Sequence, residues 1–129
     1  MKDTIRFIGT IRSSLKTRDD CPLQEAENAP GAEIEIFDEF RDGIDNLKPG
    51  ANIILLTWLH EADRSVTKCV TRRNYDSEPV GVFSTRSPDR PNPIGLHTTK
   101  IVSITKNKIK VSNLEVLDQT PLIDIKPAF

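Results

Sequence analysis

The chain has 129 residues, of which 36% are hydrophobic and 29% are charged; this balance excludes a disordered chain and predicts one globular domain spanning 1–129. No stretch approaches the roughly 20 apolar residues of a membrane span, so we expect no membrane contact. The net charge of −1 argues against a general nucleic-acid coat protein, which carries a strong basic excess, and leaves room for a local basic patch.

The N-terminus and the cysteines indicate the compartment. Residues 1–3 lead directly into a strand-like pattern without the apolar segment of a signal peptide, so we expect a cytoplasmic protein. Cys21 and Cys69 are widely spaced and belong to no CxxC motif. The sequence therefore predicts neither a disulfide framework nor a zinc site, and two histidines are too few for a histidine-rich metal site.

The first half of the chain combines strands with one long loop. Residues 5–11 have a mostly period-two pattern that predicts a first strand, and residues 12–31, which are charged and contain two prolines, predict a long loop. Alternation over 33–37 predicts a second strand. Helical spacing of apolar residues over 38–47 predicts a short helix. A continuous apolar run within 53–60 predicts a strand buried on both faces.

The second half predicts further short strands. Residues 66–73 and 80–85 are suited to strands, and 100–105 and 108–112 predict two strands joined by a two-residue turn. Residues 114–117 are a candidate for one more.

The closing segment 120–127 alternates apolar and polar residues between two prolines, which predicts an edge strand along a cleft wall. Many short strands, frequent turns and at most one short helix predict an all-β fold, either a barrel or a sandwich.

The segment 86–98 is the most informative part of the chain. Three prolines within six positions fix φ, remove three backbone donors and drive the preceding residues out of the helical region. The segment therefore predicts a stiff, extended loop and excludes a helix or a central strand. Such a loop holds the guanidinium groups of Arg86 and Arg90 and the amide of Asn92 in a fixed relation, which lowers the entropy lost on ligand binding. The alternative is a solvated turn that happens to contain arginines.

The remaining candidate side chains carry weaker signals. The sequence has no GxGxxG turn and no phosphate loop, so a nucleotide site in a doubly wound fold has no support. His60 and His97 are each more often structural than catalytic. Glu115, Asp118 and Asp124 form either a carboxylate group or solvated turns.

Several segments together resemble the TsaA-like, or TrmO-like, family, whose characterised members are S-adenosylmethionine-dependent methyltransferases acting on transfer RNA. The central motif is long and idiosyncratic, which argues against chance agreement, and the resemblance runs almost end to end. The matching segments are Ile8–Ser13, Pro22–Gln24, Leu55–His60, Gly81–Leu96 and Leu117–Pro127.

The resemblance implies a compact single-domain β-barrel of a non-Rossmann methyltransferase type, which forms a homodimer with S-adenosylmethionine held near the subunit interface. The implied reaction is methylation at N6 of threonylcarbamoyladenosine beside the anticodon of transfer RNA. The implied cofactor-binding residues come from the first loop, the end of the buried strand, the proline-rich loop and the closing segment. They are Pro22, Leu23, Gln24, Leu59, His60, Arg86, Leu96, His97, Gln119, Thr120, Pro121 and Leu122.

Elementary chemistry suggests roles for individual residues. Methyl transfer from a sulfonium depends on positioning in a dry pocket, so we expect neither a covalent nucleophile nor a metal. Arg86 is the first candidate for binding the methionine carboxylate of the cofactor or for orienting the substrate. Arg90 and Asn92 either bind RNA phosphate or organise the loop. We hypothesise that Asp124 solvates the sulfonium or accepts the N6 proton, so Asp124 and Arg86 are the expected catalytic residues.

Two features bear on the substrate. Leu23 stands where many relatives of the family carry arginine, and the acidic stretch 25–39 offers little long-range attraction for a phosphate backbone. The alternatives are a methyltransferase for another acceptor and a non-catalytic S-adenosylmethionine-binding module. A plain RNA-binding barrel fits less well, because one tryptophan and one tyrosine give few stacking platforms for bases.

Overall fold

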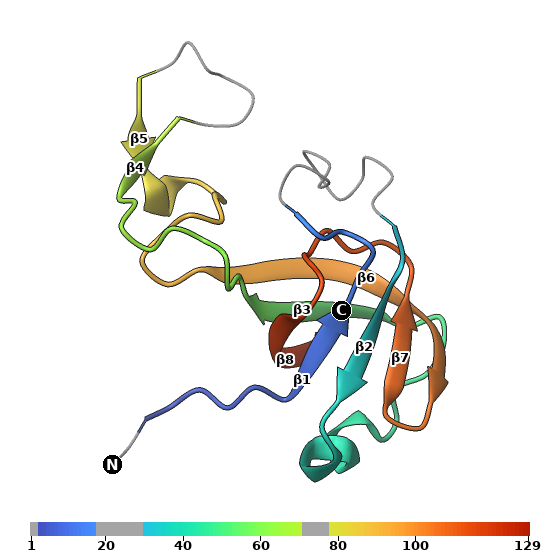
Figure 1. Cartoon of the computed structure of the whole chain (residues 1–129). Helices are drawn as coiled ribbons and strands as arrows, with labels where there is room; N and C mark the ends of the chain where they lie inside the picture. The colour runs from blue at the N-terminus through green and yellow to red at the C-terminus, as the bar shows by residue number, and fades with distance from the viewer. Residues whose placement is uncertain (1–2, 18–29, 71–77) are drawn as a thin grey trace.

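Six strands close into an antiparallel barrel in the computed structural model of the chain, which describes residues 3–17, 30–70 and 78–129 (Figure 1). The strands are β1 (Gly9–Arg12), β2 (Ala32–Ile36), β3 (Asn52–Trp58), β6 (Ile94–Thr105), β7 (Lys108–Val111) and β8 (Thr120–Pro127). Their order around the barrel is β1-β2-β7-β6-β3-β8, and β8 bonds back to β1. The expected all-β fold is confirmed, and it is a barrel rather than a sandwich.

The smaller elements lie at two places around the barrel. A two-stranded sheet of β4 (Lys68–Cys69) and β5 (Val80–Gly81) leads into the 3-10 helix η3 (Val82–Ser84), and Figure 1 shows this unit standing away from the barrel beyond one end of β3 and β6. The short helix expected over 38–47 is the 3-10 helix η2 (Asp38–Ile44). Within residues 3–17, 30–70 and 78–129, no helix is long and apolar enough to cross a membrane.

Alternating side chains fill the barrel interior, as the period-two patterns predict. In β2 and β7 every second residue is enclosed, and the same alternation continues along most of β6. In β3 only one face is fully buried, because Ile54 and Leu56 on the other face are half-exposed, so the prediction of burial on both faces is wrong. The core is formed by Ile11, Ala32, Ile34, Ile36, Ile53, Leu55, Ile101, Ile109, Val111, Leu114, Val116 and Leu122.

The strand boundaries around the proline-rich loop differ from the predicted ones. The strand expected over 80–85 ends after Gly81, because the chain turns into η3 where the Thr85 N–H donates to the Val82 carbonyl over 3.0 Å. The loop expected over 86–98 ends at Pro93, because β6 begins at Ile94 and pairs there with β3. The stiff segment is therefore shorter than predicted and continues directly into a barrel strand.

Two further predictions are corrected at the end of the chain. The closing strand β8 is not an edge strand, since it pairs with both β1 and β3. Its prolines are tolerated near its ends: Pro121 lies beyond the last residue pair with β3, and Pro127 is the final residue of the strand. Residues 114–117 form no strand. Leu114 and Val116 are nevertheless buried, and the Leu114 N–H donates to the Pro30 carbonyl rather than to a ladder.

The first strand begins later than predicted. Residues 5–8 precede β1, and Ile5 and Phe7 are exposed. Gly9 starts the strand because a Cβ at this position would lie 2.3 Å from the Glu35 carbonyl oxygen on β2. Only a glycine lets the two strands approach so closely here.

Candidate functional site

The sheet register brings the ends of four strands to one end of the barrel. Thr57, near the end of β3, lies opposite Gly95 near the start of β6 and opposite Leu122 near the start of β8. On the other side of β8, Thr120 lies opposite Ile11, near the end of β1. We call this the Thr57 end. The predicted site residues that flank it are Leu59, His60, Leu96, His97 and the segment 119–122, which come from distant parts of the sequence.

His97 is enclosed within the barrel near this end. Its Nε2 atom lies 2.9 Å from the Thr57 hydroxyl oxygen, and His97 and Thr57 are only 8% and 0% exposed. A Cβ at Gly95 would lie 2.5 Å from that hydroxyl oxygen and 2.6 Å from the His97 ring, so the glycine makes room for the pair. This placement agrees with a structural role for His97, and it leaves little of the side chain exposed to a ligand.

The proline-rich loop is held against the segment that follows β3. The Leu59 N–H donates to the Pro93 carbonyl over 2.8 Å, and the Asp63 N–H donates to the Asp89 carboxylate over 2.9 Å. Prolines have no N–H to donate, so the loop takes part in these contacts mainly as an acceptor. Two segments that both carry predicted site residues are thereby joined.

Arg90 and Asn92 make contacts within the protein. The Arg90 guanidinium donates to the Val82 carbonyl over 2.7 Å and to the Thr85 carbonyl over 3.0 and 3.1 Å. The Asn92 side-chain oxygen accepts a hydrogen bond from Arg64 over 3.3 Å. Of the two roles considered for Arg90 and Asn92, these contacts match that of organising the loop.

Arg86 differs from Arg90 and Asn92 in its contacts. It is exposed, and it makes no hydrogen bond or ion pair with the part of the chain that the structure describes. The turn before it is fixed, because the Thr85 hydroxyl donates to the Val82 carbonyl and accepts from the Ser87 N–H. The structure thus presents an available guanidinium on an ordered loop.

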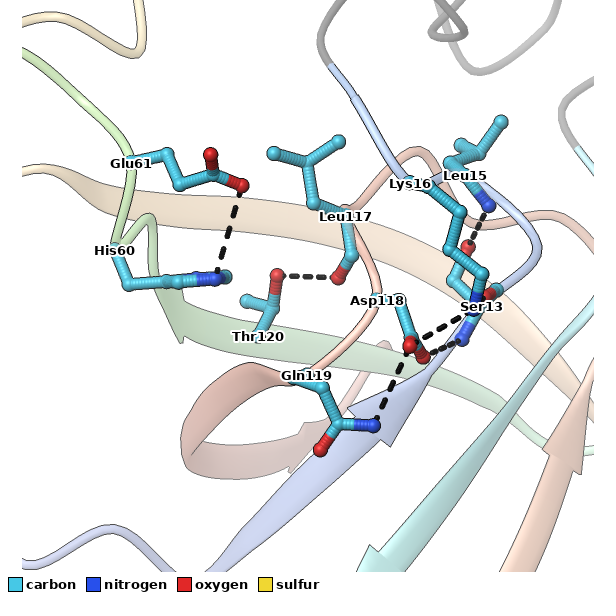
Figure 2. Close-up of polar contacts among 9 residues, drawn as sticks. All are labelled: Ser13, Leu15, Lys16, His60, Glu61, Leu117, Asp118, Gln119 and Thr120. Carbon is cyan, nitrogen blue, oxygen red and sulfur yellow. Dashed lines mark hydrogen bonds and ion pairs between the residues drawn. The ribbon is translucent and has the colours of Figure 1, made fainter.

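The other residues predicted around the loop line its junction with the barrel. Leu59 is half-buried, and its Cδ2 atom would lie 3.2 Å from a Cβ at Gly95. His60 points toward Glu61, with 3.9 Å between its Nε2 and the Glu61 carboxylate (Figure 2). Leu96 lies on the outer face of β6 and is exposed.

An ionic cluster joins the end of β1 to the start of β8 (Figure 2). The Asp118 carboxylate accepts hydrogen bonds from the Lys16 ammonium over 2.8 Å and from the Ser13 N–H over 2.9 Å. The Gln119 amide adds a weaker contact of 3.4 Å. These donors, with Lys16 foremost, lower the pKa of Asp118 from 3.8 to about 2. Asp118 is therefore held as a charged group by partners from the segment after β1.

The segment 119–122 presents its residues in two directions. Gln119 is exposed and has a φ of 69°, a left-handed conformation that costs a non-glycine residue energy. Thr120 and Leu122 are buried, and the Thr120 hydroxyl donates to the Leu117 carbonyl over 2.6 Å. A ligand at this segment would meet the side chains of Gln119 and Pro121 and the backbone of the other two residues.

Asp124 lies on the barrel wall, opposite Leu56 on β3. The pairing of β3 with β8 is irregular here: it skips Ile123, since Thr57, the next residue of β3, lies opposite Leu122. The Asp124 carboxylate accepts from the Ile125 N–H over 2.9 Å and lies 2.9 Å from the Lys126 ammonium.

The predictions on Pro22, Leu23 and Gln24, and the question of Cys21, concern residues outside the described parts of the chain. Within the described ranges, no group of histidine, cysteine, aspartate or glutamate side chains could hold a metal ion.

Sequence reasoning missed several residues of this region. Thr57 follows Ile53 and Leu55 at a spacing of two, so the alternation could have placed it inside the barrel. Lys16 and Arg64 lie in irregular segments, where no periodicity indicates a role. Their contacts depend on partners that are far away in sequence.

Comparison with known proteins places this geometry in a family. Residues 10–129 match the tRNA-methyltransferase O N-terminal domain. The chain is 41% identical over its whole length to a probable S-adenosyl-L-methionine-binding protein of Methanothermobacter thermautotrophicus, covering 92% of that protein. Over 95% of its length it is 42% identical to an S-adenosyl-L-methionine-binding protein of Archaeoglobus fulgidus, covering 86% of it.

A solved structure agrees with this assignment. The crystal structure of TrmO from Pseudomonas aeruginosa matches with a TM-score of 0.79 and 28% identity, over all of this chain and 57% of that one. The chain thus spans little more than half the length of that solved protein. The resemblance inferred from the motifs is confirmed, and the chain belongs to the family of the tRNA-methyltransferase O N-terminal domain.

Proposed function

We propose that this chain binds S-adenosylmethionine at the Thr57 end of the barrel and transfers its methyl group to N6 of threonylcarbamoyladenosine in transfer RNA. The observation that carries the proposal is the convergence at this end of the segments around Leu59, Leu96 and Thr120. Two relatives that cover almost the whole chain are named for binding S-adenosylmethionine, and the matching family is named for a transfer RNA methyltransferase.

Residues at this end and on the proline-rich loop fit the chemistry of the cofactor. S-adenosylmethionine supplies an activated methyl group on a sulfonium and also carries a carboxylate. Arg86 offers an exposed guanidinium whose planar fork matches a carboxylate. Leu59, Leu96 and Pro121 offer apolar surface that excludes water from a bound ligand. Arg86 is therefore the cofactor-binding residue that we consider first.

The contribution of the protein to the reaction is mainly positioning. The braced proline-rich loop and the barrel rim hold their side chains in a fixed relation, and such orientation accounts for much of the rate of a transfer between two bound reactants. Asp124 remains the proposed group that solvates the sulfonium or accepts the N6 proton. To take this role, the Asp124 carboxylate would give up its contact with the Lys126 ammonium. Unchanged single-turnover methylation by Asp124→Asn would remove this role.

The charges on the barrel wall are compatible with an RNA acceptor. The acidic residues of β2 are paired across the sheet: Glu35 lies 3.1 Å from the Arg12 guanidinium, and Glu33 lies 3.8 Å from the Lys108 ammonium. The acidic stretch noted in the sequence is thus partly neutralised where it joins the barrel. Long-range repulsion of a phosphate backbone is reduced accordingly.

A homodimer and a cytoplasmic setting complete the proposal. Ile94, Leu96 and Val102 are 42%, 49% and 56% exposed and project from the same outer face of β6. Ile94 and Leu96 are neighbours on this face, whereas the exposed Thr98 and Lys100 separate them from Val102. The exposed pair of Ile94 and Leu96 is suited to a self-complementary contact, which would place Leu96 near both the partner subunit and the cofactor. Transfer RNA is modified where it is used, which makes the cytoplasm the proposed compartment.

The decisive experiment separates an enzyme from a binding module. The purified chain is incubated with methyl-labelled S-adenosylmethionine and bulk transfer RNA from cells that lack their own enzyme for this modification. We expect label in threonylcarbamoyladenosine, and much less label with Arg86→Ala. Cofactor binding without any transfer would favour the non-catalytic module, a reading supported by the names of the relatives. Label in another nucleoside would overturn the proposed acceptor.

A further inference from the structure

The proline-rich loop depends on donors from elsewhere in the chain. Pro88, Pro91 and Pro93 have no N–H, so this part of the backbone cannot build its own hydrogen-bond ladder. Arg64 supplies donors: its Nε donates to the Pro91 carbonyl over 2.7 Å, and its Nη2 donates to the Asn92 side-chain oxygen over 3.3 Å. One side chain therefore holds two consecutive residues of the loop.

The same guanidinium is anchored on the barrel. The Arg64 Cζ atom lies 5.1 Å from the centre of the Trp58 ring, within the range of a cation–π contact. Trp58 is the last residue of β3 and lies opposite Ile94, the first residue of β6. Arg64 thus connects the loop to the strand end from which the segment 59–65 departs.

Arg64 holds the loop at a point between residues of the proposed cofactor site. Leu59 and His60 follow Trp58 directly, whereas Arg86 precedes the held residues and Leu96 follows them. A shift of the loop relative to the strand end would separate these two sets. Arg64 itself is not among the residues that the family resemblance implies.

We propose that Arg64 is a positioning residue, which clamps the Pro91–Asn92 part of the loop to Trp58. Together with the Leu59–Pro93 and Asp63–Asp89 hydrogen bonds, this clamp sets the distance between Arg86 and the Leu59–His60 segment. The inference rests on the proposed binding of S-adenosylmethionine. The planar fork of arginine is required, because one guanidinium must donate in two directions while it lies over a ring. A lysine ammonium would keep the charge and lose this geometry.

The test measures S-adenosylmethionine affinity by calorimetry and the melting temperature of the whole chain for wild type, Arg64→Ala, Arg64→Lys and Arg41→Ala. Arg41 is the matched control, because it is an exposed arginine on η2. This helix follows β2 at the end of the barrel opposite the Thr57 end. We expect Arg64→Ala to weaken cofactor binding about tenfold with a melting temperature close to that of wild type. Arg64→Lys should recover little of the loss, and Arg41→Ala should bind like wild type.

Kinetics with transfer RNA give a second measurement. A positioning role predicts that Arg64→Ala raises KM for S-adenosylmethionine more than it lowers kcat at saturating cofactor. Wild-type affinity in Arg64→Ala, or full recovery in Arg64→Lys, would overturn the inference while the proposed function stands. A wild-type protein that binds no S-adenosylmethionine would remove both. If Arg64→Ala does not fold, Asn92→Ala, which loses only one of the two acceptors, must show the same affinity loss in smaller degree.

Discussion

The Lys16 ammonium donates to the Asp118 carboxylate over 2.8 Å, although 102 positions separate the two residues. The contact joins the chain just after β1 to the segment just before β8. The lysine side chain is 62% exposed and the aspartate side chain 21% exposed, so solvent screens one partner more than the other. An ion pair therefore joins two segments at the Thr57 end of the barrel.

The folded-state pKa of Asp118, about 2, lies below its ordinary value of 3.8, so the folded protein binds this proton less readily than the unfolded chain. The contribution of Asp118 to the free energy of unfolding is fully present above the ordinary pKa and is lost as the pH falls toward 2. We expect Asp118→Asn to flatten the pH dependence of stability in this range, measured by urea unfolding. Asp42→Asn on η2 is the control, and parallel profiles for wild type and Asp118→Asn would refute the assignment.

Gly95→Ala should destabilise the barrel. The added Cβ would lie 2.5 Å from the Thr57 hydroxyl oxygen and 2.6 Å from the His97 ring, both of which are enclosed. We expect a loss of about 1–3 kcal/mol in the free energy of unfolding, the usual cost of overpacking. Gly43→Ala is the matched control, because no atom lies within 4 Å of the added Cβ there. Equal stability of the two variants would show that the pair is not tightly enclosed.

Gln119→Gly should stabilise the chain. Gln119 has a φ of 69°, and glycine adopts this conformation without the steric cost that other residues carry. We expect a gain of about 1 kcal/mol in the free energy of unfolding, reduced by the greater freedom of glycine in the unfolded chain. Lys106→Gly, at a φ of 56° in the turn between β6 and β7, should behave alike. A loss of stability in Gln119→Gly alone would mean that the contacts of the Gln119 side chain stabilise the fold by more than the left-handed backbone costs.

Leu96→Glu should separate the proposed dimer. A charge placed beside Ile94 on the outer face of β6 would be desolvated at the proposed subunit contact, which is strongly unfavourable. We expect sedimentation to show a dimer for wild type and a monomer for Leu96→Glu. Ile5→Glu, which alters an exposed residue before β1, should leave the dimer intact. A wild-type monomer at all accessible concentrations would disprove the dimer.

Local patterns predicted the fold where one face of a strand is enclosed. The alternation over 33–37 corresponds to β2, and the hairpin expected after residue 100 is present as the end of β6 and β7. The same alternation misleads at Leu114 and Val116, which are buried in an irregular segment that forms no strand. A side chain can be buried without its backbone pairing with another strand, and only the burial of side chains produces a periodic pattern of apolar residues in the sequence.

Predictions failed where distant contacts decide the local structure. The turn at Val82 is held by the Arg90 guanidinium, eight residues later, so the strand expected there ends early. Prolines suggested an edge position for β8, yet closure of the barrel gives it two neighbours.

The candidate site shows the same division. The proline-rich loop with Arg86 was singled out from its three prolines, the family resemblance implied the other site residues, and the register brings the start of β6, which follows the loop, beside the end of β3 and the start of β8. The clamp by Arg64 and the contact between Lys16 and Asp118 could not be predicted, because each joins two irregular segments that carry no periodic pattern.

The central claim is tested most directly by titrating S-adenosylmethionine into the purified chain and into Arg86→Ala in the same calorimetric experiment. The account predicts saturable binding by wild type and a loss of about tenfold or more in Arg86→Ala, as expected when a charge-assisted contact is removed. Absence of binding by a folded wild-type protein, or equal affinity in Arg86→Ala, would contradict it.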